Sequence, residues 1–244
     1  MKIISTYKYK LLFLIVLFFI SCLTFSQNIK QQKTSIDSLR YKKNPSYDLQ
    51  IGMFDLYKTR QADIVMLGNS LTAGASWAEL LGRSNVASRA ITGDILQGFN
   101  ARINSVIKLK PKIVFIMGGL NDIYSWIPVE EVFKRYVDIL NNLQSNGITV
   151  VIQLTTYVAK DYAKEWGSTP QLNLGRNKEI DRLNKMLSDY AATKKIEVIN
   201  LLPSIATRDG YLRPELTWDG VHFKAEAYRI WIREVEKVLR KYKM

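Results

Sequence analysis

The feature of this sequence that most restricts its fold is an alternation of short, continuous apolar runs with longer amphipathic segments. Short apolar runs are typical of strands buried on both faces of a parallel sheet. Five such runs occur, at residues 64–67, 86–91, 113–117, 149–154 and 198–202. Their alternation with helical patterns predicts a doubly wound α/β fold around a five-stranded, mostly parallel sheet.

The segments between the runs have apolar side chains at helical spacing. The apolar faces consist of Ile95, Phe99, Ile103 and Val106; Val132, Phe133, Tyr136, Val137, Leu140 and Leu143; Ile180, Leu183, Leu187 and Tyr190; and Tyr228, Trp231, Val235 and Val238. Pro111 is expected to end the first helix, and Gly147 to cap the second. Residues 160–175 have no strong period, which predicts a loop that either covers a site or lies in solvent.

The N-terminus has the pattern of an export signal. Three lysines precede an apolar run at 11–23, which is shorter than the ~20 residues that span a bilayer. We expect a signal peptide over residues 1–26, cleaved before Gln27. A single-pass anchor and a lipid anchor at Cys22 are the alternatives. Cleavage or lipidation would make the protein periplasmic or secreted, with no stable membrane insertion after cleavage.

Residues 27–61 are a polar lead-in with a short helix expected at 49–60. The rest of the chain is long enough to form one hydrophobic core.

Composition excludes several classes of site. The formal charge is +13, or about +10 without the three leader lysines. These charges are dispersed along the chain, so no nucleic-acid partner is predicted. One histidine and one cysteine cannot build the usual zinc sites, so no metal and no other cofactor is expected.

Polar residues follow the apolar runs, where a parallel sheet binds its ligands. Ser70, Gly93 and Asn121 come after the first three runs, and Asp219 and His222 precede the last helix. Ser70 is a candidate nucleophile or a helix N-cap. His222, the single histidine, is a candidate general base, because an imidazole exchanges protons near neutral pH. Asp219 can fix its tautomer, or it can cap the last helix.

Three donors could stabilise a developing oxyanion. They are the backbone N–H groups of Ser70 and Gly93 and the side-chain amide of Asn121. Each such donor contributes on the order of 10²–10³ in rate in comparable sites. The alternative roles are a left-handed turn at Gly93 and an Asx turn at Asn121.

Together these residues resemble the motif blocks of the SGNH hydrolase superfamily, the GDSL-type esterases. The blocks are VMLGNSLT at 65–72 with Ser70, RAITGD at 89–94 with Gly93, GLND at 119–122 with Asn121, and DGVH at 219–222 with Asp219 and His222. Asn69 stands where the family name has Asp, as in related acetylesterase-like members. The resemblance implies a three-layer α/β/α sandwich over residues 62–244, serine ester hydrolysis and no metal.

The second and third blocks look most similar to sialate O-acetylesterases and to acetylhydrolases of the platelet-activating-factor type. This similarity implies acetyl or other short acyl esters, and we expect O-acetyl groups on carbohydrates. Four aromatic side chains near the blocks could stack on a sugar, or could be ordinary packing residues: Tyr124, Trp126, Tyr157 and Trp218.

Rival functions remain on the same fold. A lysophospholipase or thioesterase of the GDSL type and a non-catalytic carbohydrate-binding protein are the alternatives. An α/β-hydrolase is disfavoured because GNSLT lacks the second glycine of the GxSxG elbow. No GxxxxGK[ST] phosphate loop occurs either.

Overall fold

The computed structural model describes residues 39–244. The predicted signal peptide, its cleavage site and Cys22 lie outside the described residues. By its contacts the chain divides into two units, residues 1–43 and residues 44–244. The described part of the first unit contains a short 3-10 helix, η1 (Arg40–Lys43). Everything that follows concerns the second unit.

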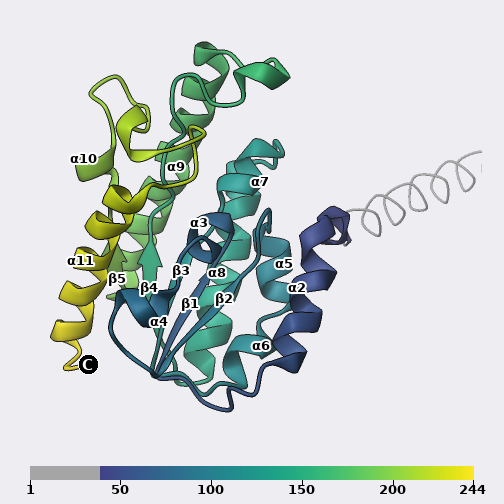
Figure 1. Ribbon diagram of the computed structural model, residues 1–244, viewed down its shortest axis with the longest axis vertical. Helices are drawn as coiled ribbons and strands as arrows, with labels where there is room; N and C mark the ends of the chain where they lie inside the picture. Colours follow the sequence, from purple (N-terminus) through teal and green to yellow (C-terminus); the bar gives the residue numbers. More distant parts are fainter. Residues whose placement is uncertain (1–38) are drawn as a thin grey trace, which may run out of the picture. The chain divides into compact units, whose positions relative to one another are not determined.

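The second unit is built on a five-stranded parallel sheet with strand order β2-β1-β3-β4-β5 (Figure 1). Its strands are β1 (Ile64–Gly68), β2 (Val86–Ala90), β3 (Ile113–Met117), β4 (Thr149–Gln153) and β5 (Glu197–Ile199). Every pair of neighbouring strands is parallel. Strands β1 and β3 are buried along their whole length. The expected α/β fold with a five-stranded sheet is thus confirmed.

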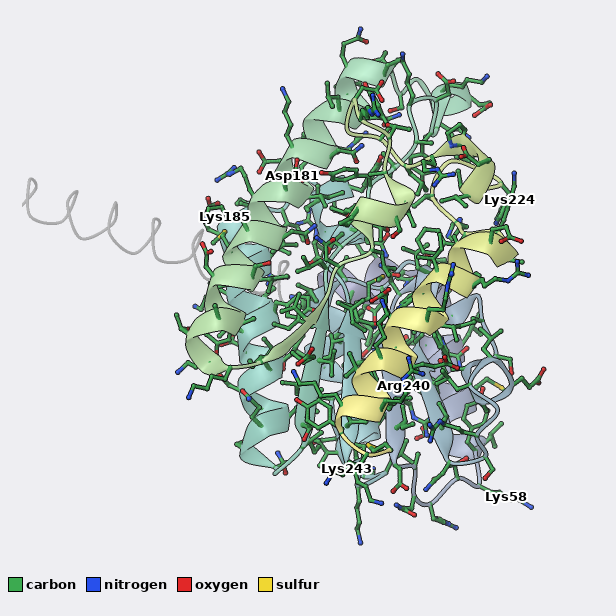
Figure 2. The ribbon with its side chains drawn as sticks, turned by 90° about the vertical axis from the view of Figure 1, so that its left-hand side faces the viewer. Lys58, Asp181, Lys185, Lys224, Arg240 and Lys243 are labelled. Atoms are coloured by element: carbon green, nitrogen blue, oxygen red, sulfur yellow. The ribbon has the colours of Figure 1, made fainter. Side chains whose placement is uncertain are left out.

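Helices connect the strands and cover the two faces of the sheet. They are α2 (Pro45–Leu56), α3 (Ser70–Ala73), α4 (Trp77–Leu80), α5 (Leu96–Ala101), α6 (Asn104–Ile107), α7 (Leu120–Tyr124), α8 (Val129–Ser145), η2 (Lys164–Trp166), α9 (Pro170–Lys194), α10 (Leu202–Ile205), η3 (Pro214–Leu216) and α11 (Ala225–Lys241). Helices α8 and α9 lie on one side of the sheet and α11 lies on the other (Figure 2). On the α11 side, the Trp77 and Trp231 rings pack edge to face, with centroids 4.8 Å apart.

Several boundaries differ from the sequence-based expectation. Helix α2 begins at Pro45, earlier than expected, because the Asn44 side chain accepts from the Ser46 amide and so caps it. The helix expected between 95 and 106 is two short helices, α5 and α6, separated at Arg102, whose guanidinium is held by buried partners. The last apolar run ends as a strand at Ile199, and Leu202 starts α10 instead.

The segment 160–175 is a loop only in its first part. Thr169 caps α9 by accepting from the Leu172 amide, and Pro170 occupies the first helical position.

Within residues 39–244, no helix combines the length and apolarity needed to cross a bilayer. Nor does this part of the chain gather three or more His, Cys, Asp or Glu side chains as a metal site would.

Candidate active site

Ser70 lies at the junction between the central strand β1 and helix α3. The N-cap of α3 is Asn69, whose Oδ1 accepts from the Leu71 amide at 3.1 Å. Ser70 is therefore the first helical residue, and its half-buried side chain is not used as the cap. A serine at this position presents Oγ and its own backbone N–H at the carboxyl edge of the sheet.

Asp219 and His222 form a hydrogen-bonded pair immediately before α11. Asp219 Oδ2 lies 2.5 Å from His222 Nδ1, and both side chains are partly exposed. Asp219 Oδ1 accepts from the Val221 amide at 2.9 Å and from the His222 amide at 2.7 Å. Since Nδ1 is bound to the carboxylate, Nε2 is the ring nitrogen left to exchange a proton with a substrate or nucleophile.

The hydrogen bonds around Asp219 also govern its ionisation. Burial acts to raise the pKa of Asp219, but the hydrogen bonds from His222 and from the Val221 amide outweigh it and hold that pKa below its usual range. The carboxylate is therefore ionised at neutral pH. It does not cap α11, whose N-cap position is Lys224.

The turn that carries this pair is closed by Thr217. Its Oγ1 donates to the His222 carbonyl at 2.7 Å and accepts from the Gly220 amide at 2.9 Å. Gly220 has φ +96, and a Cβ at this position would lie 2.8 Å from Tyr162 Cβ. Only glycine fits both the left-handed backbone and this close contact. The neighbouring Trp218 ring stacks on the His222 ring, with centroids 5.5 Å apart and 19° between the planes.

Helix α11 is tied directly to helix α3. The Tyr228 hydroxyl donates to the Leu71 carbonyl at 2.7 Å. Leu71 follows Ser70 in the chain, and Tyr228 stands in the first turns of the helix that begins just after His222. This bond ties α11, the helix that follows the Asp219–His222 turn, to the helix that begins at Ser70.

The other two candidate oxyanion donors, Gly93 and Asn121, are connected by Asp94, which follows Gly93 in the chain and accepts a hydrogen bond from Asn121. Gly93 has φ +73, the left-handed conformation expected of a turn glycine. The Asn121 Nδ2 group donates to the Asp94 carbonyl at 2.8 Å, which leaves the second N–H of this amide for another acceptor. Asn121 lies in helix α7 and not in an Asx turn.

A buried arginine joins these segments, and the sequence reading missed it. Arg102 donates from Nε to Asp94 Oδ2 at 2.8 Å, from Nη1 to the Arg89 carbonyl at 2.9 Å and from Nη2 to the Gly68 carbonyl at 3.1 Å. The available signal was a cation within the apolar face that contains Phe99. Arg102 thereby links the ends of β1 and β2 to the turn that precedes α5.

Asp122 reinforces the same region from α7. Both of its carboxylate oxygens lie within 3.2 Å of the Leu96 amide at the start of α5. Burial raises the pKa of Asp122 to about 7. Burial also raises the pKa of Asp94, to about 6, and the Arg102 guanidinium opposes that rise.

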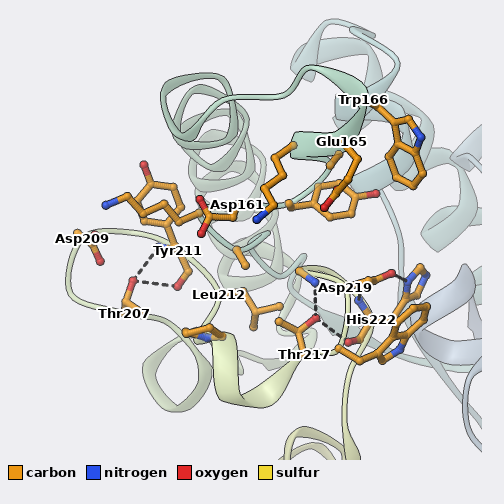
Figure 3. A pocket seen from close by; sticks show the side chains of 18 residues that line it. Asp161, Glu165, Trp166, Thr207, Asp209, Tyr211, Leu212, Thr217, Asp219 and His222 are labelled. Carbon is orange, nitrogen blue, oxygen red and sulfur yellow. Dashed lines mark hydrogen bonds and ion pairs between the residues drawn. The ribbon is translucent and has the colours of Figure 1, made fainter.

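A cavity of about 840 Å³ opens beside the Asp219–His222 pair (Figure 3). Its walls come from residues 159–166, from residues 207–214 and from the turn 217–222. Of the described residues, the lining includes Asp219 and His222 but not Ser70, Gly93 or Asn121. The cavity therefore lies on the histidine side of the site.

The four aromatic side chains expected near the substrate lie in different places. Trp218 lines the cavity. Tyr124 packs edge-on against Tyr162, Trp126 covers the Arg176 guanidinium, and Tyr157 donates to Asp181. The aromatic residues that share the cavity with Trp218 are Tyr162, Trp166 and Tyr211, of which the first two belong to the segment expected either to cover a site or to lie in solvent. The missing helical period of the segment after residue 160 was the signal for the first two.

Comparisons relate this chain to known proteins. The GDSL-like lipase/acylhydrolase family profile matches residues 66–230. N-acylneuraminate cytidylyltransferase of Streptococcus agalactiae serotype V is 25% identical over 184 residues, which are 72% of this chain and 40% of that protein. The chain thus matches well under half the length of that curated relative.

Solved structures share the fold. A protein described as an acylhydrolase from Bacteroides fragilis has 26% identity and a TM-score of 0.69 over 80% of this chain and 97% of its own. A GDSL-like lipase from Bacteroides thetaiotaomicron has 22% identity and a TM-score of 0.68 over 80% and 98%. An acetyl xylan esterase has 15% identity and a TM-score of 0.58 over 72% and 99%. The last two, being under 25% identical, indicate the fold alone.

Proposed function

This chain belongs to the GDSL-like lipase/acylhydrolase family and is a carboxylic ester hydrolase, and we propose that it uses Ser70 to remove short acyl groups, acetyl above all, from carbohydrate hydroxyls. The observation that carries the proposal is the Asp219–His222 pair, with 2.5 Å between Oδ2 and Nδ1, in the turn before α11. Tyr228 of α11 is in turn bonded to the helix that Ser70 begins. A serine hydrolase needs a nucleophile, a base and a carboxylate that orients the base.

The proposed reaction gives each of these residues a role. His222 Nε2 takes the hydroxyl proton of Ser70 as Oγ attacks the ester carbonyl. The N–H groups of Ser70, Gly93 and Asn121 stabilise the oxyanion that forms. His222 then gives its proton to the leaving alcohol, and an acyl-serine remains. Water, activated by the same imidazole, hydrolyses the acyl-serine and restores the free enzyme.

The preference for short acyl groups and for sugar alcohols has two supports. The motif blocks resemble those of acetylesterases. The cavity beside His222 also contains charged as well as aromatic side chains, including Lys160, Asp161 and Glu165, which suits a polar alcohol better than a lipid.

The test of this function is covalent labelling combined with kinetics. The wild-type protein should hydrolyse p-nitrophenyl acetate and react with a fluorophosphonate at Ser70, as read by peptide mass spectrometry. Ser70→Ala should lose both properties, whereas Ser76→Ala, a change at an exposed serine nearby, should keep both. Turnover by a folded Ser70→Ala protein at the wild-type rate would refute the mechanism, and faster hydrolysis of octanoyl than acetyl esters would refute the acyl preference.

Export is a separate proposal that rests on the leader pattern of residues 1–26. Expression of the full chain in a diderm host should yield a periplasmic or secreted protein that begins at Gln27. An N-terminal diacylglyceryl Cys22 would instead establish the lipid-anchored alternative.

A further inference from the structure

The cavity lies on the side of the site from which the alcohol must depart. In ester hydrolysis the imidazole protonates the leaving oxygen, while the oxyanion donors hold the carbonyl oxygen elsewhere. Of the described residues, Asp219 and His222 line the cavity, and none of the three candidate oxyanion donors does. A substrate bound for reaction therefore directs its alcohol half into this cavity.

The size of the cavity indicates a substantial alcohol. Its volume of about 840 Å³ falls within the range of roughly 300–1,000 Å³ that is usual for small-molecule sites. An acetyl group would fill only a small part of it. Methanol or ethanol esters would likewise leave most of the cavity unfilled.

Aromatic surfaces face the cavity from both of its walls. Trp166, on the upper wall in Figure 3, lies across the cavity from Thr217 and His222 and is 84% exposed. Trp218 stacks on His222 and is 68% exposed. Exposed tryptophans beside a catalytic base offer flat apolar faces, against which the C–H face of a sugar ring can pack.

The charge of the cavity is opposite to that of the chain. Although the chain carries a formal +13, the lining has two lysines against four carboxylates. These charged residues are Lys160, Lys164, Asp161, Glu165, Asp209 and Asp219. Hydrogen bonds lower the pKa of Asp209 as well as that of Asp219, so both carry their charge at neutral pH. An anionic alcohol would meet like charge here.

We propose, resting on the proposed esterase function, that this cavity is the alcohol subsite and that it selects an uncharged sugar ring, with Trp166 and Trp218 as its stacking surfaces. The lysines and carboxylates supply donors and acceptors for sugar hydroxyls, which a cavity for a purely apolar alcohol would not need. The excess of carboxylates discriminates against sugar acids and other anionic alcohols.

Matched substrates test the charge selection. Monoacetylated methyl glucoside and monoacetylated methyl glucuronide share a ring and differ by one carboxylate. We expect kcat/KM to favour the glucoside by about tenfold at low salt, with a smaller ratio as salt rises. Equal or faster hydrolysis of the glucuronide would overturn the proposal. Faster hydrolysis of acetylcholine than of the glucoside would also overturn it and identify a cationic alcohol instead.

Matched variants test the residues. Trp166→Ala should lower the ratio of kcat/KM for the glucoside acetate to that for ethyl acetate by about tenfold. Trp126→Ala removes another exposed tryptophan, outside the cavity, and should leave this ratio at the wild-type value. An unchanged ratio in Trp166→Ala would refute the stacking surface.

A double substitution tests the carboxylates. Glu165→Gln with Asp209→Asn should raise the relative kcat/KM for the glucuronide, whereas Asp189→Asn with Glu226→Gln, at exposed positions elsewhere, should not. Equal ratios in the two double variants would refute the charge selection. Failure of the wild type on every ester would refute the esterase function itself. Ester hydrolysis without sugar selectivity would refute the subsite alone.

Discussion

Arg102 and Asp94 form a buried ion pair, with 2.8 Å between Nε and Oδ2 and with both side chains 1% exposed or less. A buried ion pair adds little net stability over well-packed apolar residues, but removal of one partner is costly. The pair is notable for its position. The Arg102 guanidinium also binds the Gly68 carbonyl, and the Asp94 carbonyl binds the Asn121 amide. The segments that carry the three candidate oxyanion donors therefore share one buried junction.

Arg102→Lys should lower kcat far more than it raises KM, because a lysine keeps the charge but cannot reach all three acceptors. Asn121→Ala should itself lower kcat by about 10²–10³. If Arg102 acts by positioning Asn121, the double variant should be little worse than Asn121→Ala. Arg229→Lys, in an exposed ion pair, is the control. Simple addition of the two losses would mean that Arg102 does not act through Asn121.

His222→Ala should lower kcat by on the order of 10⁶, the loss measured when the base of a serine hydrolase is removed. Asp219→Asn should lose up to ~10⁴, because an amide no longer fixes the ring tautomer. In the wild type, kcat/KM should rise as the pH is raised, since only the neutral imidazole can accept the Ser70 proton. A pH–rate profile measures this rise, and its persistence in His222→Ala would contradict the assignment.

The raised pKa of Asp122 predicts that the free energy of unfolding falls as the pH rises. Its carboxyl ionises near 3.8 in ordinary surroundings and near 7 in the folded protein. Between these values the folded protein keeps a proton that the unfolded chain has released, so the free energy of unfolding falls by up to about 1.4 kcal/mol per pH unit. Asp122→Asn should remove this component. Urea denaturation from pH 4.5 to 7.5 compares the slopes, and parallel curves would refute it.

Tyr228→Phe removes the hydrogen bond that ties α11 to α3. Burial raises the pKa of Tyr228 to about 12, so the hydroxyl is a donor at neutral pH. We expect a loss of about 1 kcal/mol in stability and a fall in kcat as His222 shifts relative to Ser70. Tyr190→Phe, which loses a bond to the exposed side chain of Asn141, is the control. A stable Tyr228→Phe with full kcat would show that the tie does not position the site.

Chelation should leave activity unchanged, because the proposed chemistry uses only side chains and backbone donors of this chain. Dialysis against EDTA, followed by assay with and without added Zn²⁺ or Mg²⁺, measures this. Loss of activity on dialysis and its return with a divalent ion would contradict the serine mechanism.

Local signals in the sequence were sufficient for the strands and for the motif blocks. The apolar runs predicted the bounds of β1 and β3 almost to the residue, because a strand buried on both faces needs a continuous apolar run. Helix α2 starts before the expected residue, Leu49, although its signal, Asn44 before Pro45, is local. The local sign of the buried Arg102 was a cation within an apolar helix face, but its bonds to Asp94 and Gly68 could not be predicted from that sign.

The sequence by itself determined the α/β class, the order of the strands along the chain and the chemical types of the candidate site. These follow from side-chain period, capping and short spacings, which act over a few residues. Only the tertiary structure decided that Arg102 joins Gly68, Arg89 and Asp94, and that Trp166 and Trp218 share a cavity. The bonds of Arg102 connect residues up to 34 positions apart, and such contacts depend on how the helices pack on the sheet, which no local pattern encodes.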